Sequence, residues 1–120
     1  DLKARWFRLA AMLADRAGDG SGALAYWQSA LESDPLDGRA MMALANSWRE
    51  GAPAKARQWM LRASRQHRVQ RQALLRLAEW AVEDGMWDDA LRYVQEARSA
   101  KDDPRLRRYA DQLRAWIEEQ

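Results

Sequence analysis

The sequence predicts an all-α fold, and three observations support that prediction. β-Branched residues are scarce, because Thr is absent, the single Ile is Ile117, and Val occurs only three times. Ala, Leu, Arg, Gln and Glu, which favour helices over strands, are abundant. Gly, Pro and short polar stretches then divide the 120 residues into seven helical stretches.

Turn residues separate the first four predicted helices. The break between the first and second stretches lies at three closely spaced glycines, Gly18, Gly20 and Gly22. Asp34-Pro35 ends the second stretch. Gly51 and Pro53 separate the third from the fourth, with Pro53 at a first helical position, where a missing N–H costs nothing.

The last three predicted helices are bounded in the same way. A polar stretch at 65–68 precedes the fifth helix, and Gly85 divides the fifth from the sixth. Asp103 and Pro104 cap and begin the seventh, expected at 104–119. Its apolar residues fall on one stripe with spacings of four, three and four: Leu106, Ala110, Leu113 and Ile117.

Small residues recur along the chain at intervals of 33 or 34 residues. The columns are Ala11, Ala45 and Ala78; Ala23, Ala56 and Ala90; Ala30, Ala63 and Ala97; and Gly18, Gly51 and Gly85. An aromatic column, Tyr26, Trp59 and Tyr93, keeps the same register. Helices that cross at close range need a small residue at the contact and a larger neighbour beside it. The columns therefore predict a stack of similar helix pairs.

The sequence resembles the tetratricopeptide repeat (TPR) family on these positions. Ala23-x3-Trp27-x2-Ala30-Leu31-x2-Asp34-Pro35 is similar to the second helix of a family unit and its closing turn, and Gly85-x-Trp87-x2-Ala90 to the turn signature. The resemblance implies a right-handed helical solenoid of about three helix-turn-helix repeats, at 4–36, 37–68 and 69–102, plus one C-terminal helix. The turn of the second unit is one residue short of the family pattern.

We expect the 120 residues to form a single repeat segment of a longer protein, since the sequence opens at Asp1 without Met. Two interpretations of the helix at 104–119 remain open. It is either a terminal cap on the stack or the first helix of a fourth repeat, and Trp116, spare apolar surface in a cap, favours the second slightly.

Catalytic and metal-binding patterns are not evident, so we predict no enzyme, no cofactor and no metal. Cys is absent, and the single His67 lies among Arg and Gln with no second ligand. Asp88-Asp89 and Asp102-Asp103 fall at helix starts, where carboxylates cap free N–H groups. The glycine-rich 18–22 lacks the Lys and preceding strand of a phosphate loop.

Seven tryptophans divide into two groups. Trp27, Trp48 and Trp87 fall on core positions of the family, and the aromatic column at Trp59 is expected to fill one inter-repeat hole each time. The others lie outside the columns and are candidates for exposed anchors: Trp6, Trp80 and Trp116.

The net charge is only +2, yet residues 55–76 carry seven cations and no acid. This basic edge consists of Lys55, Arg57, Arg62, Arg65, Arg68, Arg71 and Arg76. Two interpretations stay open: a solvated edge, or a docking patch for an acidic protein surface or an anionic polymer. Nucleic acid is disfavoured, because the interleaved aromatics are assigned to packing.

The resemblance also implies a partner-binding groove lined by the first helix of each unit. Carried onto this chain, the groove positions are Arg5, Arg8 and Met12; Arg39, Met42, Asn46 and Arg49; and Gln72, Leu75, Arg76 and Glu79. Met12 stands where the family's carboxylate clamp has Asn, so a mixed Met/Arg/Asn groove suits an amphipathic or acidic segment better.

We therefore expect a protein-protein interaction scaffold, with binding of an anionic polymer or acidic surface by 55–76 as the alternative. No membrane contact is expected, since no apolar run approaches the roughly 20 residues that span a bilayer. The Arg- and Ala-rich composition is typical of GC-rich bacteria. The chain is similar to TPR regions of bacterial exopolysaccharide export proteins of the Pel type, which implies a periplasmic segment of an outer-membrane, biofilm-forming apparatus that recruits a polysaccharide-modifying enzyme.

Overall fold

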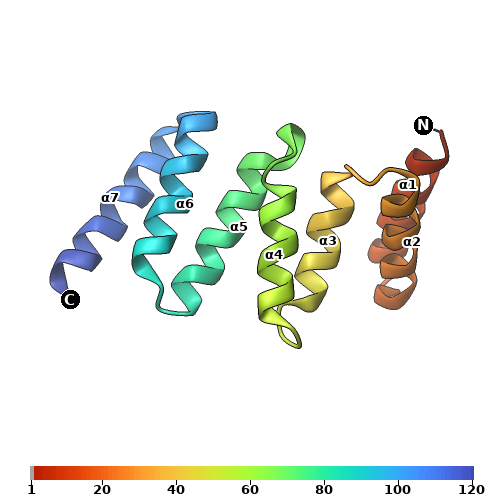
Figure 1. Ribbon diagram of the computed structural model, residues 1–120, viewed down its shortest axis with the longest axis horizontal. Coiled ribbons are helices and arrows are strands. Elements are labelled where there is room, and N and C mark those ends of the chain that lie inside the picture. The colour runs from red at the N-terminus through yellow and green to blue at the C-terminus, as the bar shows by residue number, and fades with distance from the viewer. Residues whose placement is uncertain (1) are drawn as a thin grey trace. The chain divides into compact units, whose positions relative to one another are not determined.

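A computed structural model describes residues 2–120 and confirms the all-α prediction (Figure 1). The part of the chain that it describes contains seven α-helices and no strand. In chain order they are α1 (Leu2–Arg16), α2 (Gly20–Ser33), α3 (Gly38–Trp48), α4 (Pro53–Ala63), α5 (Gln70–Glu83), α6 (Trp87–Ala100) and α7 (Pro104–Glu119), with a 3-10 turn, η1 (His67–Val69), before α5.

The helices form two compact units, the first ending at Gln66 and the second beginning at His67. In the first unit α1 packs on α2, α2 on α3, and α3 on α4. In the second unit α5 packs on α6 and α6 on α7. Within each unit, helices that follow one another in sequence are therefore neighbours in space, which is consistent with a helical repeat.

The alanine columns lie at the helix contacts. All nine members are 0–1% exposed: Ala11, Ala45, Ala78, Ala23, Ala56, Ala90, Ala30, Ala63 and Ala97. Larger side chains fill the space beside them, with Met60 fully buried in the first unit and Leu77 and Val94 in the second. The predicted small-residue seams are confirmed in both units.

The first unit has its hydrophobic core around Trp27, which is 6% exposed. Trp27 joins the alanines of α1 and α2 to Ala40 and Leu44 of α3, and Phe7, Leu24, Leu31 and Trp48 pack on the outside of this cluster. One large ring thus fills the hole that several small residues leave, which is the arrangement that close helix crossings require.

Two of the three turns within helix pairs have the same backbone. Gly18 and Gly85 both have a positive φ, 79° and 72°. In the first turn Asp19 N–H donates to Ala14 O at 2.9 Å, and in the other Met86 N–H donates to Ala81 O at 2.8 Å, which is the Schellman pattern of helix ends. The α3–α4 turn differs, because Ala52 N–H donates to Trp48 O and Gly51 has no positive φ. The expected irregularity of the second turn is confirmed.

The structure corrects the first predicted break. Gly20 and Gly22 lie inside the first turn of α2, so only Ala17, Gly18 and Asp19 separate the helices. Asp19 caps α2 by accepting a hydrogen bond from Gly22 N–H at 3.0 Å. A β-carbon on Gly22 would collide with that carboxylate, so the glycine permits the cap rather than breaking the helix.

The second unit confirms the predicted seventh helix, Pro104–Glu119. Its buried residues are Leu106, Ala110 and Leu113, three of the four on the predicted stripe, and Ile117 is half-buried. Asp103 caps the helix by accepting from Arg105 N–H at 2.8 Å, with Pro104 at the first helical position. The other expected acidic pair, Asp88 and Asp89, lies in the first turn of α6.

Candidate partner-binding surfaces

In the first unit, the residues carried over as groove positions lie on α1 and α3, except Arg49, which follows the last residue of α3. An ion pair joins these two helices: Arg8 Nε of α1 lies 3.5 Å from Asp37 Oδ2. The Asp37 side chain is 2% exposed and also caps α3 by accepting from Ala40 N–H at 3.2 Å. Arg8 is therefore already engaged, because it supplies the cation that the buried Asp37 carboxylate requires.

Helices α1 and α3 also leave side chains of several kinds open to solvent. Met12 is 40% exposed, Met42 is half-buried, and Arg39 and Asn46 are exposed. The three α3 residues follow one stripe of the helix, spaced by three and four. We call Met12, Arg39, Met42 and Asn46 the α1–α3 surface. These residues provide adaptable thioethers, a guanidinium and an amide.

In the second unit, the carried-over positions lie on α5. Leu75 is half-buried, and Gln72, Arg76 and Glu79 are exposed. Arg76 Nη1 donates to Glu79 Oε2 at 3.0 Å, so these two charges partly neutralise each other within one turn.

The basic edge divides between the units. Lys55, Arg57, Arg62 and Arg65 belong to the first unit and are exposed. Arg68, Arg71 and Arg76 belong to the second, where Arg68 and Arg76 are exposed and Arg71 is half-buried. Arg71 Nη2 donates to Asp103 Oδ2 at 2.7 Å, so an acid far away in sequence partners one of the seven cations.

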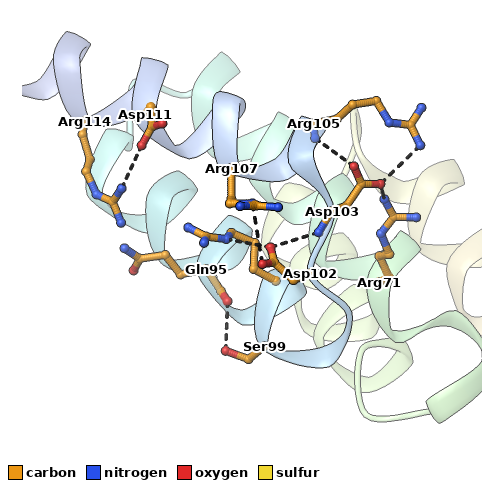
Figure 2. A network of polar contacts seen from close by, with 10 residues as sticks. Arg71, Gln95, Ser99, Asp102, Asp103, Arg105, Arg107, Asp111 and Arg114 are labelled. Atoms are coloured by element: carbon orange, nitrogen blue, oxygen red, sulfur yellow. Dashed lines mark hydrogen bonds and ion pairs between the residues drawn. The ribbon is translucent and has the colours of Figure 1, made fainter.

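Figure 2 shows that Asp103 belongs to a polar network at the start of α7. Besides Arg71, it accepts from the N–H and the guanidinium of Arg105, at 2.8 and 3.3 Å. These bonds, chiefly the one from the Arg105 backbone N–H, lower the pKa of Asp103 below its ordinary value. Asp102 pairs with Arg98 at 3.3 Å and Arg107 at 3.6 Å. The network joins α5, α6 and α7 and has a structural role.

The three tryptophans outside the columns have different positions. Trp6 and Trp116 are 58% and 45% exposed, whereas Trp80 is 6% exposed. The interpretation of Trp80 as an exposed anchor is therefore wrong, since it belongs to the core of the second unit. Trp116 contacts Trp87 edge to face at 5.6 Å. Of the three assigned to the core, Trp27 is buried and Trp48 and Trp87 are half-buried.

The aromatic column does not fill one kind of hole. Tyr93 is 7% exposed, Trp59 is half-buried, and Tyr26 is 36% exposed. Tyr26 packs edge to face on Trp6 at 5.9 Å, whereas Trp59 packs on Trp48 at 5.8 Å. The three rings recur at a regular interval in the sequence, but the prediction that each fills the same kind of hole between repeats is wrong.

Sequence reasoning missed an apolar stripe on α1. Leu2, Leu9 and Leu13 are 82%, 55% and 56% exposed and share a face with Trp6. The spacing 2, 6, 9, 13 alternates four and three residues and was a readable signal of this face. It lies opposite the buried Ala4 and Ala11, so α1 is apolar on two sides.

Metal-ligating side chains do not cluster in residues 2–120. His67 is exposed, as predicted, and within this range no group of three His, Cys, Asp or Glu could hold a metal ion. Burial raises the pKa of Tyr109, with a further contribution from Glu79.

None of the helices described is long and apolar enough to cross a membrane.

Comparison with known proteins leaves the family open. No protein-family model matches the chain, and a search of curated proteins finds no match.

Proposed function

We propose that this chain is a non-catalytic scaffold that binds a segment of another protein on the α1–α3 surface. The observation that supports this most directly is that Met12 of α1 and Arg39 and Asn46 of α3 are exposed, whereas the alanines of the seams are buried in the contacts between helices. Apolar side chains left open among polar ones are typical of recognition surfaces.

The partner segment that suits this surface is amphipathic or acidic. Met12 and Met42 adapt to an apolar face, and Arg39 supplies forked donors to a carboxylate. Clamping of a chain-terminal carboxylate by Arg8 is disfavoured, because Arg8 pairs with Asp37 and its removal would leave a buried charge alone.

A more specific proposal for the fold, location and partner follows from the resemblance of the sequence to the TPR family. We propose a right-handed TPR-type stack in the periplasm of a bacterium, where it recruits a polysaccharide-modifying enzyme to an exopolysaccharide exporter. Its support is the residue register of the repeats, together with the packing of sequence-adjacent helices.

Site-specific photocrosslinking tests the scaffold proposal. A benzophenone amino acid at Asn46 would lie on the α1–α3 surface, and the same residue at the exposed Ala25 of α2 is the matched control. In an envelope extract of the source cells, we expect one discrete adduct from position 46 and none from 25. Equal labelling, or no adduct from either position, would contradict the proposal.

A second candidate function is binding of an anionic polymer or acidic surface by the basic edge. The supporting observation is that all four cations of its first-unit part are exposed, with no acid between 51 and 66. Affinity for heparin is then expected to fall log-linearly with salt concentration. Absence of binding at low salt would exclude the polymer form of this candidate.

A further inference from the structure

The first unit has a shallow cavity of about 440 Å³, widely open to solvent, that is lined by residues of α2, α3 and α4. Leu31, Leu44, Trp48 and Trp59 form its apolar lining, and Gln28 and Glu32 of α2 add an amide and a carboxylate. This mixture of aromatic side chains with a few polar groups also lines many sites that recognise a ring-shaped group. The cavity does not involve the α1–α3 surface.

Two indoles with their own cations form the α3–α4 side of the cavity. The rings of Trp48 and Trp59 lie 5.8 Å apart at 55°. Lys55 Nζ lies 4.1 Å from the centre of the Trp48 ring, and the Arg62 guanidinium carbon lies 4.7 Å from the centre of the Trp59 ring. Lys55, Trp59 and Arg62 follow one stripe of α4, and each cation lies against one of the two indoles that line the cavity.

The charges around the cavity are unequal. No Asp or Glu occurs in 51–66, which contains all of α4, whereas four cations there are exposed. Glu32, on the α2 wall, is the carboxylate of the lining and accepts hydrogen bonds. A ligand that complements this arrangement has an apolar ring with one donor and carries negative charge on the side of α4.

We propose that this cavity binds the aromatic side chain of an acidic protein segment. A tryptophan or tyrosine of the partner enters between Leu31, Trp48 and Trp59, and its N–H or O–H donates to Glu32. Asp or Glu residues next to this anchor pair with Lys55 and Arg62. An aromatic anchor suits such a site because it buries a large area with little loss of side-chain entropy.

This inference specifies the acidic-partner form of the second candidate and is independent of the α1–α3 surface. If the cavity binds no anchor, crosslinking at Asn46 is unaffected. If crosslinking fails, binding to the cavity is still measurable. The two proposals can therefore fail separately.

The test is calorimetric titration of the whole chain with short blocked peptides. The first peptide has a central Trp between Glu residues, the second has Ala in place of that Trp, and the third has Gln in place of the Glu residues. We expect the first to bind at least about tenfold more tightly than either of the others. This comparison changes only the peptide, so the folding of a variant does not affect it.

Two charge reversals on α4 supply the matched protein control. Arg62→Glu alters the cation above Trp59, whereas Arg57→Glu makes the same charge change on a different side of the helix. We expect Arg62→Glu to weaken the Trp peptide about tenfold and Arg57→Glu to change its affinity less than about twofold, with circular dichroism confirming that both variants fold.

Three results would overturn the inference. Equal affinity for the Trp and Ala peptides would mean that charge alone is recognised. Equal weakening by Arg57→Glu and Arg62→Glu would mean that the positions around the cavity are not special. Absence of binding by the Trp peptide at low salt would exclude the site.

Discussion

In each unit an arginine of one helix pairs with the aspartate that caps a later helix, but the two aspartates are buried to different extents. In the first, Arg8 of α1 reaches Asp37, the cap of α3, and in the second, Arg71 of α5 reaches Asp103, the cap of α7. Asp37 is 2% exposed and Asp103 18%. We therefore expect the same pair of residue types to matter more for stability in the first unit than in the second.

The largest expected effect comes from Arg8→Leu. It leaves the Asp37 carboxylate buried without its cation, so the free energy of unfolding of the first unit should fall by about 2 kcal/mol. Hydrogen exchange measured separately over α1–α3 and α5–α7 checks this, and the second unit serves as the internal reference. Arg5→Leu on the same helix is the control, and an equal loss there would contradict the role of the ion pair.

The Schellman turns should respond alike in both units. Gly18→Ala and Gly85→Ala should each cost about 1 kcal/mol, because both residues have a positive φ and no atom lies within 4 Å of an added β-carbon. Gly51→Ala should change stability by less than about 0.5 kcal/mol, since its φ is not positive. Thermal denaturation compares the three, and a Gly51→Ala loss equal to the others would refute the distinction.

Arg71→Leu should cost less than Arg8→Leu. Asp103 retains the N–H and guanidinium of Arg105 after Arg71 is removed, and the Arg71 side chain is 36% exposed. The measurement is the same exchange experiment, now with the first unit as the reference. A loss as large as that from Arg8→Leu would show that the depth of burial does not explain the difference between the units.

Acid should act on the second unit through Asp103. Its folded pKa lies below the ordinary value of 3.8, so its contribution to stability is complete above that value and is lost as the pH falls below it, through the folded pKa. Asp103→Asn, which keeps a cap, should remove this part of the acid sensitivity of α7. Thermal midpoints measured from about pH 5 to about pH 2 would show the effect, and unchanged profiles would refute it.

The local features of the fold were predictable from the sequence for physical reasons. Ala23, Ala56 and Ala90 are recognisable because a close helix crossing leaves room only for small side chains. Asp103-Pro104 is recognisable because the start of a helix needs a hydrogen-bond acceptor and accommodates a residue that has no N–H. The same reasoning failed at Gly20 and Gly22, where the nearby Asp19 cap made a helical first turn favourable.

The candidate site was less predictable than the fold. Met12 and Asn46 are exposed, whereas Arg8 has a structural partner and Trp80 is buried. The cavity at Trp48 and Trp59 brings together three helices. No spacing within one helix encodes it, because its walls meet only after α2, α3 and α4 have packed.

The sequence by itself thus determined the helices, their caps and the small-residue seams, since each depends on neighbours within a turn or on one repeated interval. Tertiary structure alone decided which charges are neutralised, as in the Arg71–Asp103 pair 32 residues apart, and which aromatic rings are exposed. The reason is physical: burial and ion pairing depend on what a side chain meets across a helix contact, which the local pattern does not specify.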